Sequence, residues 1–165
     1  MSYKVILNNL DSSSATAARS DLACRLAIFQ SAHLIGLAAT SLAVAGGDAH
    51  RDSGGSATAV AAHRMDQEAQ QEIARFEQQC TKLAVQSYES RRVASALLEA
   101  IKWHERFCDL VVIGRETPKS DTGISPLTFT EKVLLGSSRP VLIVPSQLRA
   151  NQATNKAVIA WDGSP

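Results

Sequence analysis

Three residues whose types suit ligand binding lie at the ends of predicted strands or at the start of a predicted helix: Asp11, Gly114 and Thr128. Asp11 ends the apolar run that begins at Val5, and Gly114 ends the apolar segment 109–114. Glycine lets a ligand approach the backbone closely, and a threonine hydroxyl at a helix N-terminus lies where an anion is favoured. In a parallel sheet all three residues lie beyond the carboxyl ends of the strands, where such sheets bind ligands.

Each of these residues also has a purely structural interpretation. Asp11 is equally suited to cap a helix, and Gly114 to form a turn. Thr128 precedes Glu131 by three residues, which is the pattern of a capping box. Asp48, His50 and Asp52 alternate and could meet a metal ion, but no further close ligand completes a site, which favours a solvated loop. The spacing shows neither a Ser/His/Asp nor a Cys/His arrangement.

The composition excludes several classes of protein. The 165 residues suit one domain, and a net charge of +1 with 5% aromatic residues argues against nucleic acid as a partner. The three cysteines are widely spaced, without a Cys-x-x-Cys motif, so neither a disulfide framework nor a zinc site is expected. No apolar run approaches the length of a membrane span. We therefore expect a cytoplasmic protein with no membrane partner.

The apolar periodicity predicts strands that alternate with helices, which favours an open parallel sheet. Helix 13–31 is expected to begin at Ser12–Ser14 and to bury Ala18, Leu22, Leu26 and Phe29. The predicted strands are 3–10, 33–40, 84–88, 109–114 and 141–144; the other predicted helices are 61–82, 92–106 and 129–135.

Four finer expectations accompany these elements. Glycine and serine make segment 41–60 a flexible loop by composition, which predicts the most mobile internal part of the chain. Trp103 and Phe107 are expected to pack, and Gly136 is expected to cap the last helix. Cys24 and Cys108 are expected to behave as small buried apolar groups.

The end of the chain repeats its beginning. Residues 156–165 read as lysine, an apolar strand, an aspartate and small residues, as residues 4–13 do. This similarity is either a coincidence between two short strands or the start of a second repeat. The second interpretation divides the chain into a domain at 1–145, a linker at 146–156 and the first strand of a truncated repeat at 157–165.

The order of these segments resembles the universal stress protein family over roughly residues 3–145, as the first half of a tandem member. The resemblance rests on segments 6–11, 109–114, 131–134 and 139–145, together with 160–164 as the opening of a second repeat. It implies an α/β fold with a five-stranded parallel sheet of order 3-2-1-4-5 and helices on both faces.

Nucleotide-binding members of that family carry Gly-x2-Gly-x9-Gly-Ser/Thr after the fourth strand. The same spacing falls here on Gly114, Thr117, Leu127 and Thr128, so two of the three glycines are missing. Side chains at these positions obstruct the backbone N–H groups that would hold phosphates. The resemblance also assigns nucleotide contact to Asp11.

These observations predict a non-enzymatic stress-response module that acts through binding, with a degenerate nucleotide loop and no required cofactor. The alternative is an ATP-binding switch or slow ATPase that uses Asp11, Gly114 and Thr128. A nucleotide-using enzyme on the same fold is a third hypothesis.

The expected partner is a second copy of the chain. Segment 141–144 is apolar, uncharged and placed at a sheet edge, a poor composition for an edge left in water. Segment 157–161 is a second apolar strand without a sheet of its own. We expect a homodimer in which strand 141–144 or this tail crosses the interface, as strand 5 commonly does in the family.

Overall fold

The computed structural model describes residues 2–41, 55–115 and 128–146. Their strands form one all-parallel sheet of order β3-β2-β1-β4-β5, which confirms the predicted topology. The strands are β1 (Val5–Leu10), β2 (His33–Ser41), β3 (Tyr88–Ala96), β4 (Leu110–Gly114) and β5 (Val141–Val144). β1 lies at the centre and pairs with both β2 and β4.

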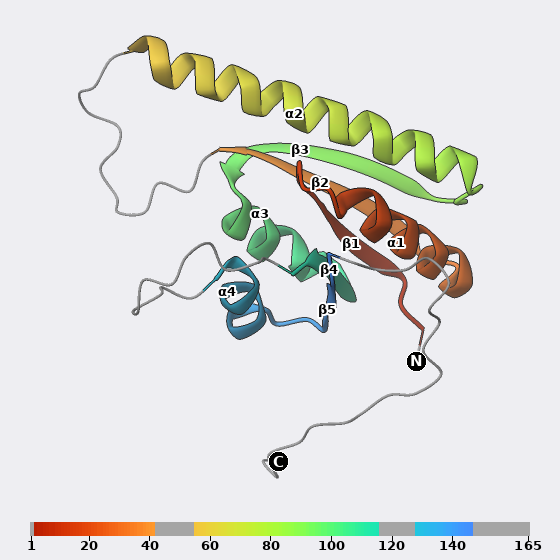
Figure 1. The fold of residues 1–165 in the computed structure, drawn as a ribbon. Coiled ribbons are helices and arrows are strands. Elements are labelled where there is room, and N and C mark those ends of the chain that lie inside the picture. Colours follow the sequence, from red (N-terminus) through yellow and green to blue (C-terminus); the bar gives the residue numbers. More distant parts are fainter. Residues whose placement is uncertain (1, 42–54, 116–127, 147–165) are drawn as a thin grey trace.

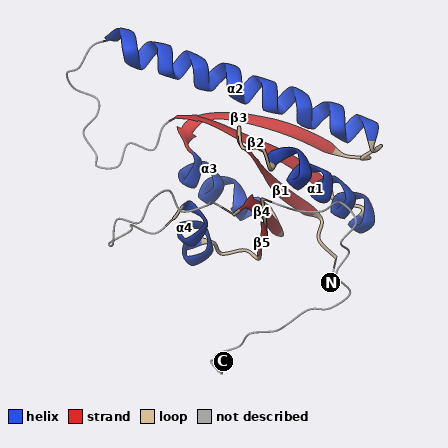
Figure 2. Cartoon of the chain, viewed as in Figure 1, coloured by secondary structure: helices blue, strands red, loops and turns tan. Residues whose placement is uncertain are grey.

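The helices form a layer on each face of the sheet (Figures 1 and 2). Helices α1 (Thr16–Gln30) and α2 (Gly55–Lys82) cover one face; α3 (Leu97–His104) and α4 (Phe129–Gly136) cover the other. A single 3-10 turn, Glu105–Phe107, joins α3 to β4. None of the helices in the described ranges is long and apolar enough to cross a membrane.

Alternation along β1 builds a separate apolar core on each face. Ile6 and Leu10 pack under α1 and α2, whereas Leu7 packs under α3 and α4. β4 is buried on both faces from Leu110 to Ile113, which explains why its sequence is continuously apolar.

Helix α1 buries a different face from the one that its apolar residues predicted. Ala18, Leu22 and Leu26 are only partly buried and Phe29 is 81% exposed. The buried face instead carries Thr16, Arg19, Ser20, Ala23, Cys24 and Ala27. Small side chains allow the helix to approach the sheet closely, so packing outweighs the apolar periodicity here.

The ends of α1 also differ from the prediction. The helix starts at Thr16 after Ala15, which makes no side-chain cap, so Ser12–Ser14 do not act as helix caps. Its last turn closes at Ser31, which has a left-handed φ of 52°, and Ala32 N donates to Ala27 O at 2.9 Å. A non-glycine residue thus adopts the conformation that such a cap requires.

The strand predicted at 84–88 is wrong. Residues 84–87 close the end of α2: Ala84 has a φ of 56° and Val85 N donates to Cys80 O at 3.0 Å. β3 begins at Tyr88 and takes in residues up to Ala96 that were assigned to the next helix. Among the described strands, β3 is an edge strand that pairs with β2 alone, and charged side chains suit such an edge. No apolar run therefore marks it in the sequence.

Other boundaries are partly corrected. Helix α2 starts at Gly55, inside the predicted loop, and the rest of that loop, 42–54, lies outside the described residues, as do the linker and tail at 147–165. Phe76 of this helix is 1% exposed. Gly136 is the last residue of α4 rather than its cap, since Ser137 is the extended cap residue.

The aromatic residues near the end of α3 were predicted wrongly. Trp103 is 66% exposed and Phe107 is 75% exposed. Helix α3 buries Ala100 and Ile101 against the sheet, so Trp103 lies on its outer side, beside the guanidinium of Arg106 at 5.0 Å. The expectation that Cys24 and Cys108 are buried is confirmed.

Gly36 on β2 provides a test of the α2–sheet packing. A Cβ atom at this position would lie 2.6 Å from Cε1 of Phe76 and 3.0 Å from Cδ1 of Leu10. We expect Gly36→Ala to lower the free energy of unfolding by about 2 kcal/mol, because overpacking forces rigid core groups apart. Urea denaturation measures this change.

Gly136→Ala is the matched control. The new Cβ atom would meet the flexible end of Lys102 at 3.1 Å, and the helical conformation at this position suits alanine. The free energy of unfolding should change by no more than about 0.5 kcal/mol. Equal effects of the two substitutions would contradict the packing of Phe76 on Gly36.

Candidate functional site

The candidate site lies where strands β1 and β4 end side by side. β2 pairs with one edge of β1, and β4 pairs with the other. The chain continues from β1 to β2, so the carboxyl ends of β1 and β4 form the topological switch point of the sheet. Asp11 follows β1 directly and Gly114 ends β4. The structure therefore brings these two predicted site residues to the same edge, and it places Arg19 of α1 between them.

The Arg19 guanidinium is buried in a network at this edge. Its Nη2 lies 2.8 Å from Asp11 Oδ2 and donates to Thr16 Oγ1 at 3.0 Å, while Nε donates to Asn9 O at 3.1 Å. The residue is 1% exposed. A guanidinium removed from water needs a charge partner, and Asp11 is that partner.

Gly114 makes room for this arginine. A Cβ atom on Gly114 would lie 2.3 Å from Arg19 Nη1. Close approach to the backbone, expected here of a ligand, is made instead by a side chain of the same protein.

The Asp11 carboxylate is held by several donors at once. Oδ1 accepts from Ser13 N at 3.0 Å and from the Thr16 hydroxyl at 2.5 Å; Oδ2 also accepts from Asn9 Nδ2 at 3.0 Å. Burial by itself raises the pKa of Asp11, but the Arg19 charge and these hydrogen bonds outweigh burial, so the pKa lies below its ordinary value. Asp11 is ionised and committed to internal contacts.

Thr128 forms the predicted capping box at the start of α4. Glu131 N donates to Thr128 Oγ1 at 3.3 Å, and Thr128 N donates to Glu131 Oε2 at 2.7 Å. The backbone hydrogen bond from Thr128 lowers the pKa of Glu131, so a carboxylate already occupies this helix N-terminus. This confirms the structural interpretation of Thr128.

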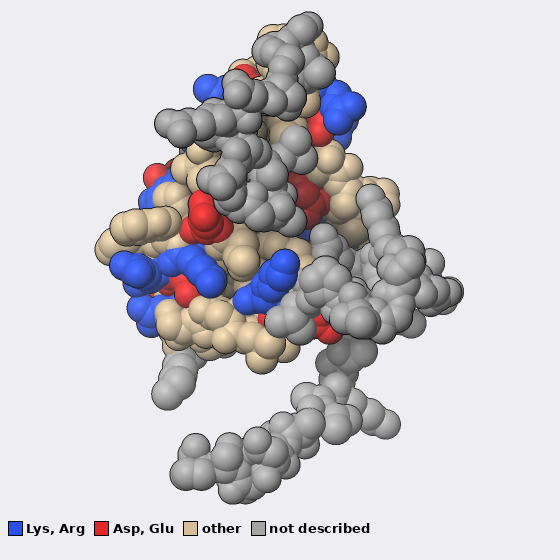
Figure 3. All heavy atoms as spheres, turned by 90° about the vertical axis from the view of Figure 1, so that its left-hand side faces the viewer, with Lys and Arg blue, Asp and Glu red and all other residues tan. Residues whose placement is uncertain are grey.

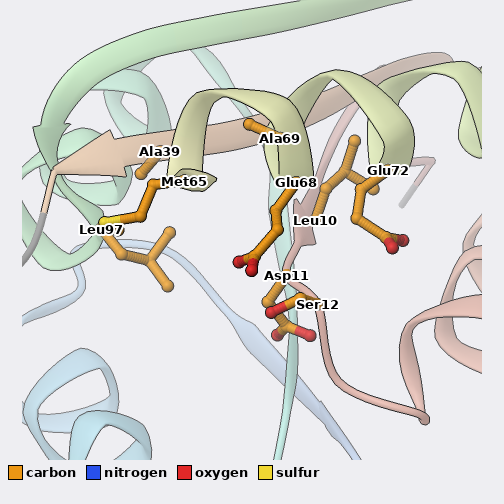
Figure 4. A pocket seen from close by; sticks show the side chains of 9 residues that line it. All are labelled: Leu10, Asp11, Ser12, Ala39, Met65, Glu68, Ala69, Glu72 and Leu97. Carbon is orange, nitrogen blue, oxygen red and sulfur yellow. The ribbon is translucent and has the colours of Figure 1, made fainter. Parts of the chain in front are cut away.

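A small pocket of about 190 Å³ opens beside Asp11, between the end of β1 and helix α2 (Figure 4). Its lining combines carboxylates with apolar side chains: Leu10, Asp11, Ser12, Ala39, Met65, Glu68, Ala69, Glu72 and Leu97. Glu68 and Glu72 reach down from α2 on the side of the pocket where Asp11 and Ser12 lie.

The two glutamates differ in their surroundings. Glu72 is 8% exposed and forms an ion pair with Arg75, whereas Glu68 lies 3.6 Å from Arg64 at the surface. The pocket therefore presents carboxylate oxygens to a ligand, together with the hydroxyl of Ser12. Beyond the pocket, the face in Figure 3 carries basic and acidic side chains together in its described part.

Several predicted site residues cannot be placed. Thr117 and Leu127, which occupy the family's glycine positions, lie outside the described residues, as do Asp48, His50 and Asp52. Within residues 2–41, 55–115 and 128–146, no group of three or more His, Cys, Asp or Glu side chains could hold a metal ion.

Sequence reasoning missed Arg19, Glu68 and Glu72. Arg19 is spaced four residues before the buried Ala23 and shares its helix face, a signal that was hidden because the apolar residues of α1 mark another face. The glutamates lie in a helix rich in Gln, Glu and Arg, and nothing local distinguishes them from their neighbours.

Comparison with known proteins identifies the fold. No protein-family model matches the sequence, and no curated protein matches it significantly. Among solved structures, the universal stress protein UspA from Lactobacillus plantarum aligns with a TM-score of 0.66 at 19% identity, over 87% of this chain and 99% of the other.

Two further universal stress proteins were solved with nucleotides. One, in complex with cAMP, aligns with a TM-score of 0.58 at 19% identity, over 89% of this chain and 100% of the other. The other, from Archaeoglobus fulgidus in complex with dAMP, aligns at 0.57 and 17% identity, over 87% of this chain and 98% of the other. The chain therefore has the universal stress protein fold.

The Asp11–Arg19 pair leads to a stability prediction. Asp11→Asn leaves a buried guanidinium without its counter-charge, so we expect the free energy of unfolding at neutral pH to fall by about 3 kcal/mol. Asp21→Asn is the matched control: it removes an exposed pair with Arg25 on the same helix and should cost no more than about 0.5 kcal/mol. Urea denaturation compares the two, and equal losses would contradict the buried pair.

The same variant has a pH signature. The pKa of Asp11 is lower in the folded than in the unfolded protein, so its ionisation stabilises the fold at any pH above the unfolded pKa, which is near 4. This contribution to the free energy of unfolding disappears as the pH falls through the pKa of the folded protein. The difference in stability between wild type and Asp11→Asn should therefore shrink as the pH is lowered below about 4. A constant difference from neutral to acid pH would contradict an ionised Asp11.

Proposed function

We propose that this chain is a universal stress protein domain that acts in a stress response by binding rather than by catalysis, with a nucleotide site that has lost its affinity for ATP. The observation that carries the proposal is the Arg19–Asp11 ion pair, which occupies the switch point with groups of the protein itself. The absence of two family glycines, at Thr117 and Leu127, agrees with it.

The charges around the site disfavour phosphate groups. The carboxylates of Glu68 and Glu72 line the pocket beside Asp11, and the positive charge of Arg19 is neutralised by that aspartate. The N-terminus of α4 already holds the Glu131 carboxylate. A triphosphate brought to this edge meets like charges, which raises the free energy of the complex.

The size of the pocket supports the same conclusion. Pockets for drug-sized ligands measure about 300–1,000 Å³, whereas this one measures about 190 Å³. Its carboxylates suit a small ligand that donates hydrogen bonds or carries positive charge. We expect such a ligand, or another protein, to be the binding partner.

The competing function is an ATP-binding switch or slow ATPase. Two solved structures with this fold are complexes with cAMP and dAMP, which favours a nucleotide ligand. In that case Asp11 would have to exchange its contacts with Arg19 for contacts with the ligand. The two functions differ in whether ATP binds and turns over.

Calorimetry with ATP and magnesium tests the proposal. We expect no saturable binding at micromolar ATP, together with no release of phosphate above the buffer rate. If the side chains of Thr117 and Leu127 obstruct the nucleotide loop, the double substitution Thr117→Gly, Leu127→Gly should increase the affinity for ATP. The single substitution Glu68→Gln separately tests the effect of the pocket's negative charge on that affinity. A dissociation constant in the low micromolar range for the wild type would overturn the proposal.

We also propose that the chain forms a homodimer through β5. This strand lies at the end of the sheet, and Val141, Leu142 and Ile143 are only partly buried although they are apolar. In the described part of the chain, nothing pairs with its outer edge. A second copy of β5 would satisfy the free backbone groups and cover the side chains.

Sedimentation tests the dimer. The full chain should sediment as a dimer at micromolar concentration, and Ile143→Lys should produce a monomer because it places a charge in the interface. Val60→Lys, a similar change at an exposed position of α2, is the control and should leave the dimer intact. A chain that ends at Pro145 should remain dimeric; loss of the dimer on this truncation would assign the interface to the tail. A monomeric wild type would refute the proposal.

A further inference from the structure

Two cysteines from neighbouring helices meet in the core beneath α1 and α2. Cys24 Sγ of α1 lies 3.6 Å from Cys80 Sγ of α2, and both residues are 0% exposed. We propose that Cys24 and Cys80 are a site of oxidative modification, at which a peroxide converts the two thiols into an intramolecular disulfide. This inference is independent of the proposed ligand-binding function.

The geometry favours the bond. A disulfide joins its sulfur atoms at about 2.05 Å, so the thiols, already in contact at 3.6 Å, must approach by about 1.5 Å. Cys80 lies in the last turn of α2, where the chain turns away at Ala84 into the loop before β3. A small adjustment of this helix end against α1 brings the sulfur atoms together without separating strands of the sheet.

The chemistry balances without a cofactor. A thiolate attacks one oxygen of hydrogen peroxide and breaks the O–O bond, which gives a sulfenic acid and, after protonation of the leaving hydroxide, water. The second thiol then attacks the sulfenic sulfur, its proton leaves with the displaced hydroxide as a second water, and the S–S bond forms. Two thiols are oxidised and one peroxide is reduced.

The contact between the two thiols also favours ionisation of one of them, since the hydrogen bond from Cys80 lowers the pKa of Cys24. The thiol that attacks the peroxide therefore has the resolving thiol already in contact with it.

The seam between α1 and α2 is hollowed near the two cysteines, neither of which lines the hollow itself. A pocket of about 150 Å³ opens there, lined among others by Ser20 and Phe76. Ser20 precedes Cys24 by one helical turn, and Phe76 precedes Cys80 by one turn. The pocket has room for several water molecules and hence for hydrogen peroxide.

Cys108 supplies an internal control for burial. It is 1% exposed and belongs to the core on the opposite face of the sheet, where its Sγ donates to His104 O at 3.2 Å. Burial raises its pKa to about 11. The chain has three cysteines, and the other two lie on the far side of the sheet, so Cys108 has no thiol with which to pair.

The test is peptide mapping of the folded full-length protein after treatment with hydrogen peroxide. Remaining thiols are alkylated in urea, and trypsin then releases Cys24 in peptide 20–25, Cys80 in peptide 76–82 and Cys108 in peptide 107–115. We expect the first two peptides to appear joined, with a mass lower by two hydrogen atoms than their sum, and the third to appear alkylated. Reduction should restore both separate peptides.

Variants and a stability measurement complete the test. Cys108→Ala should retain the cross-link, whereas Cys24→Ala and Cys80→Ala should lose it. The cross-link should also raise the urea midpoint of the wild type, but not of Cys24→Ala, because it restricts the unfolded chain. Three alkylated cysteines after treatment of the folded wild type, or equal pairing of Cys24 with Cys80 and with Cys108, would overturn the proposal.

Discussion

The burial of one charged side chain governs the architecture of the switch-point edge. Arg19 is 1% exposed and is among the largest side chains that the fold buries completely. Its guanidinium reaches the end of β1 through Asn9 O and Asp11, and lies against Gly114 at the end of β4. Removing such a group from water costs several kcal/mol unless its charge is matched, so α1, β1 and β4 are fixed relative to one another by the need to keep the ion pair intact.

This constraint decides what the site offers to a ligand. Without Arg19, an aspartate after β1 and a glycine after β4 would be free to contact a ligand at the edge of the sheet. With it, the carboxylate is saturated by internal donors and the space over the glycine is filled. In the described part of the chain, a small pocket opens beside Asp11 and carries carboxylates among its polar groups, two of them from α2. Other proteins with this fold were solved in complex with cAMP and dAMP.

The α1–α2 side of the sheet also concentrates the unusual packing of this protein. The two helices lie close to the sheet because their buried residues include alanine, serine and cysteine, and because Gly36 accepts the ring of Phe76. Close packing brings Cys24 and Cys80 into contact and leaves a narrow pocket along the helix seam. The two cysteines and the pocket beside Asp11 thus lie in neighbouring parts of one layer, and Glu72 lines both pockets.

The sequence by itself determined that the sheet is open and parallel, because its apolar runs alternate with helical segments. The strand order was predicted from the resemblance to the universal stress protein family and is confirmed. The sequence also determined the capping box of Thr128 and Glu131, since both partners lie within one turn of the chain. Only the tertiary structure decided which face of α1 is buried, that Arg19 joins Asp11 to Gly114, and that Cys24 meets Cys80. The physical reason is that local patterns record hydrogen bonding and burial within an element, whereas these contacts depend on how closely separate elements pack. The distance between two packed elements depends on the small side chains that both of them place at the contact, so it cannot be predicted from either segment of the sequence alone.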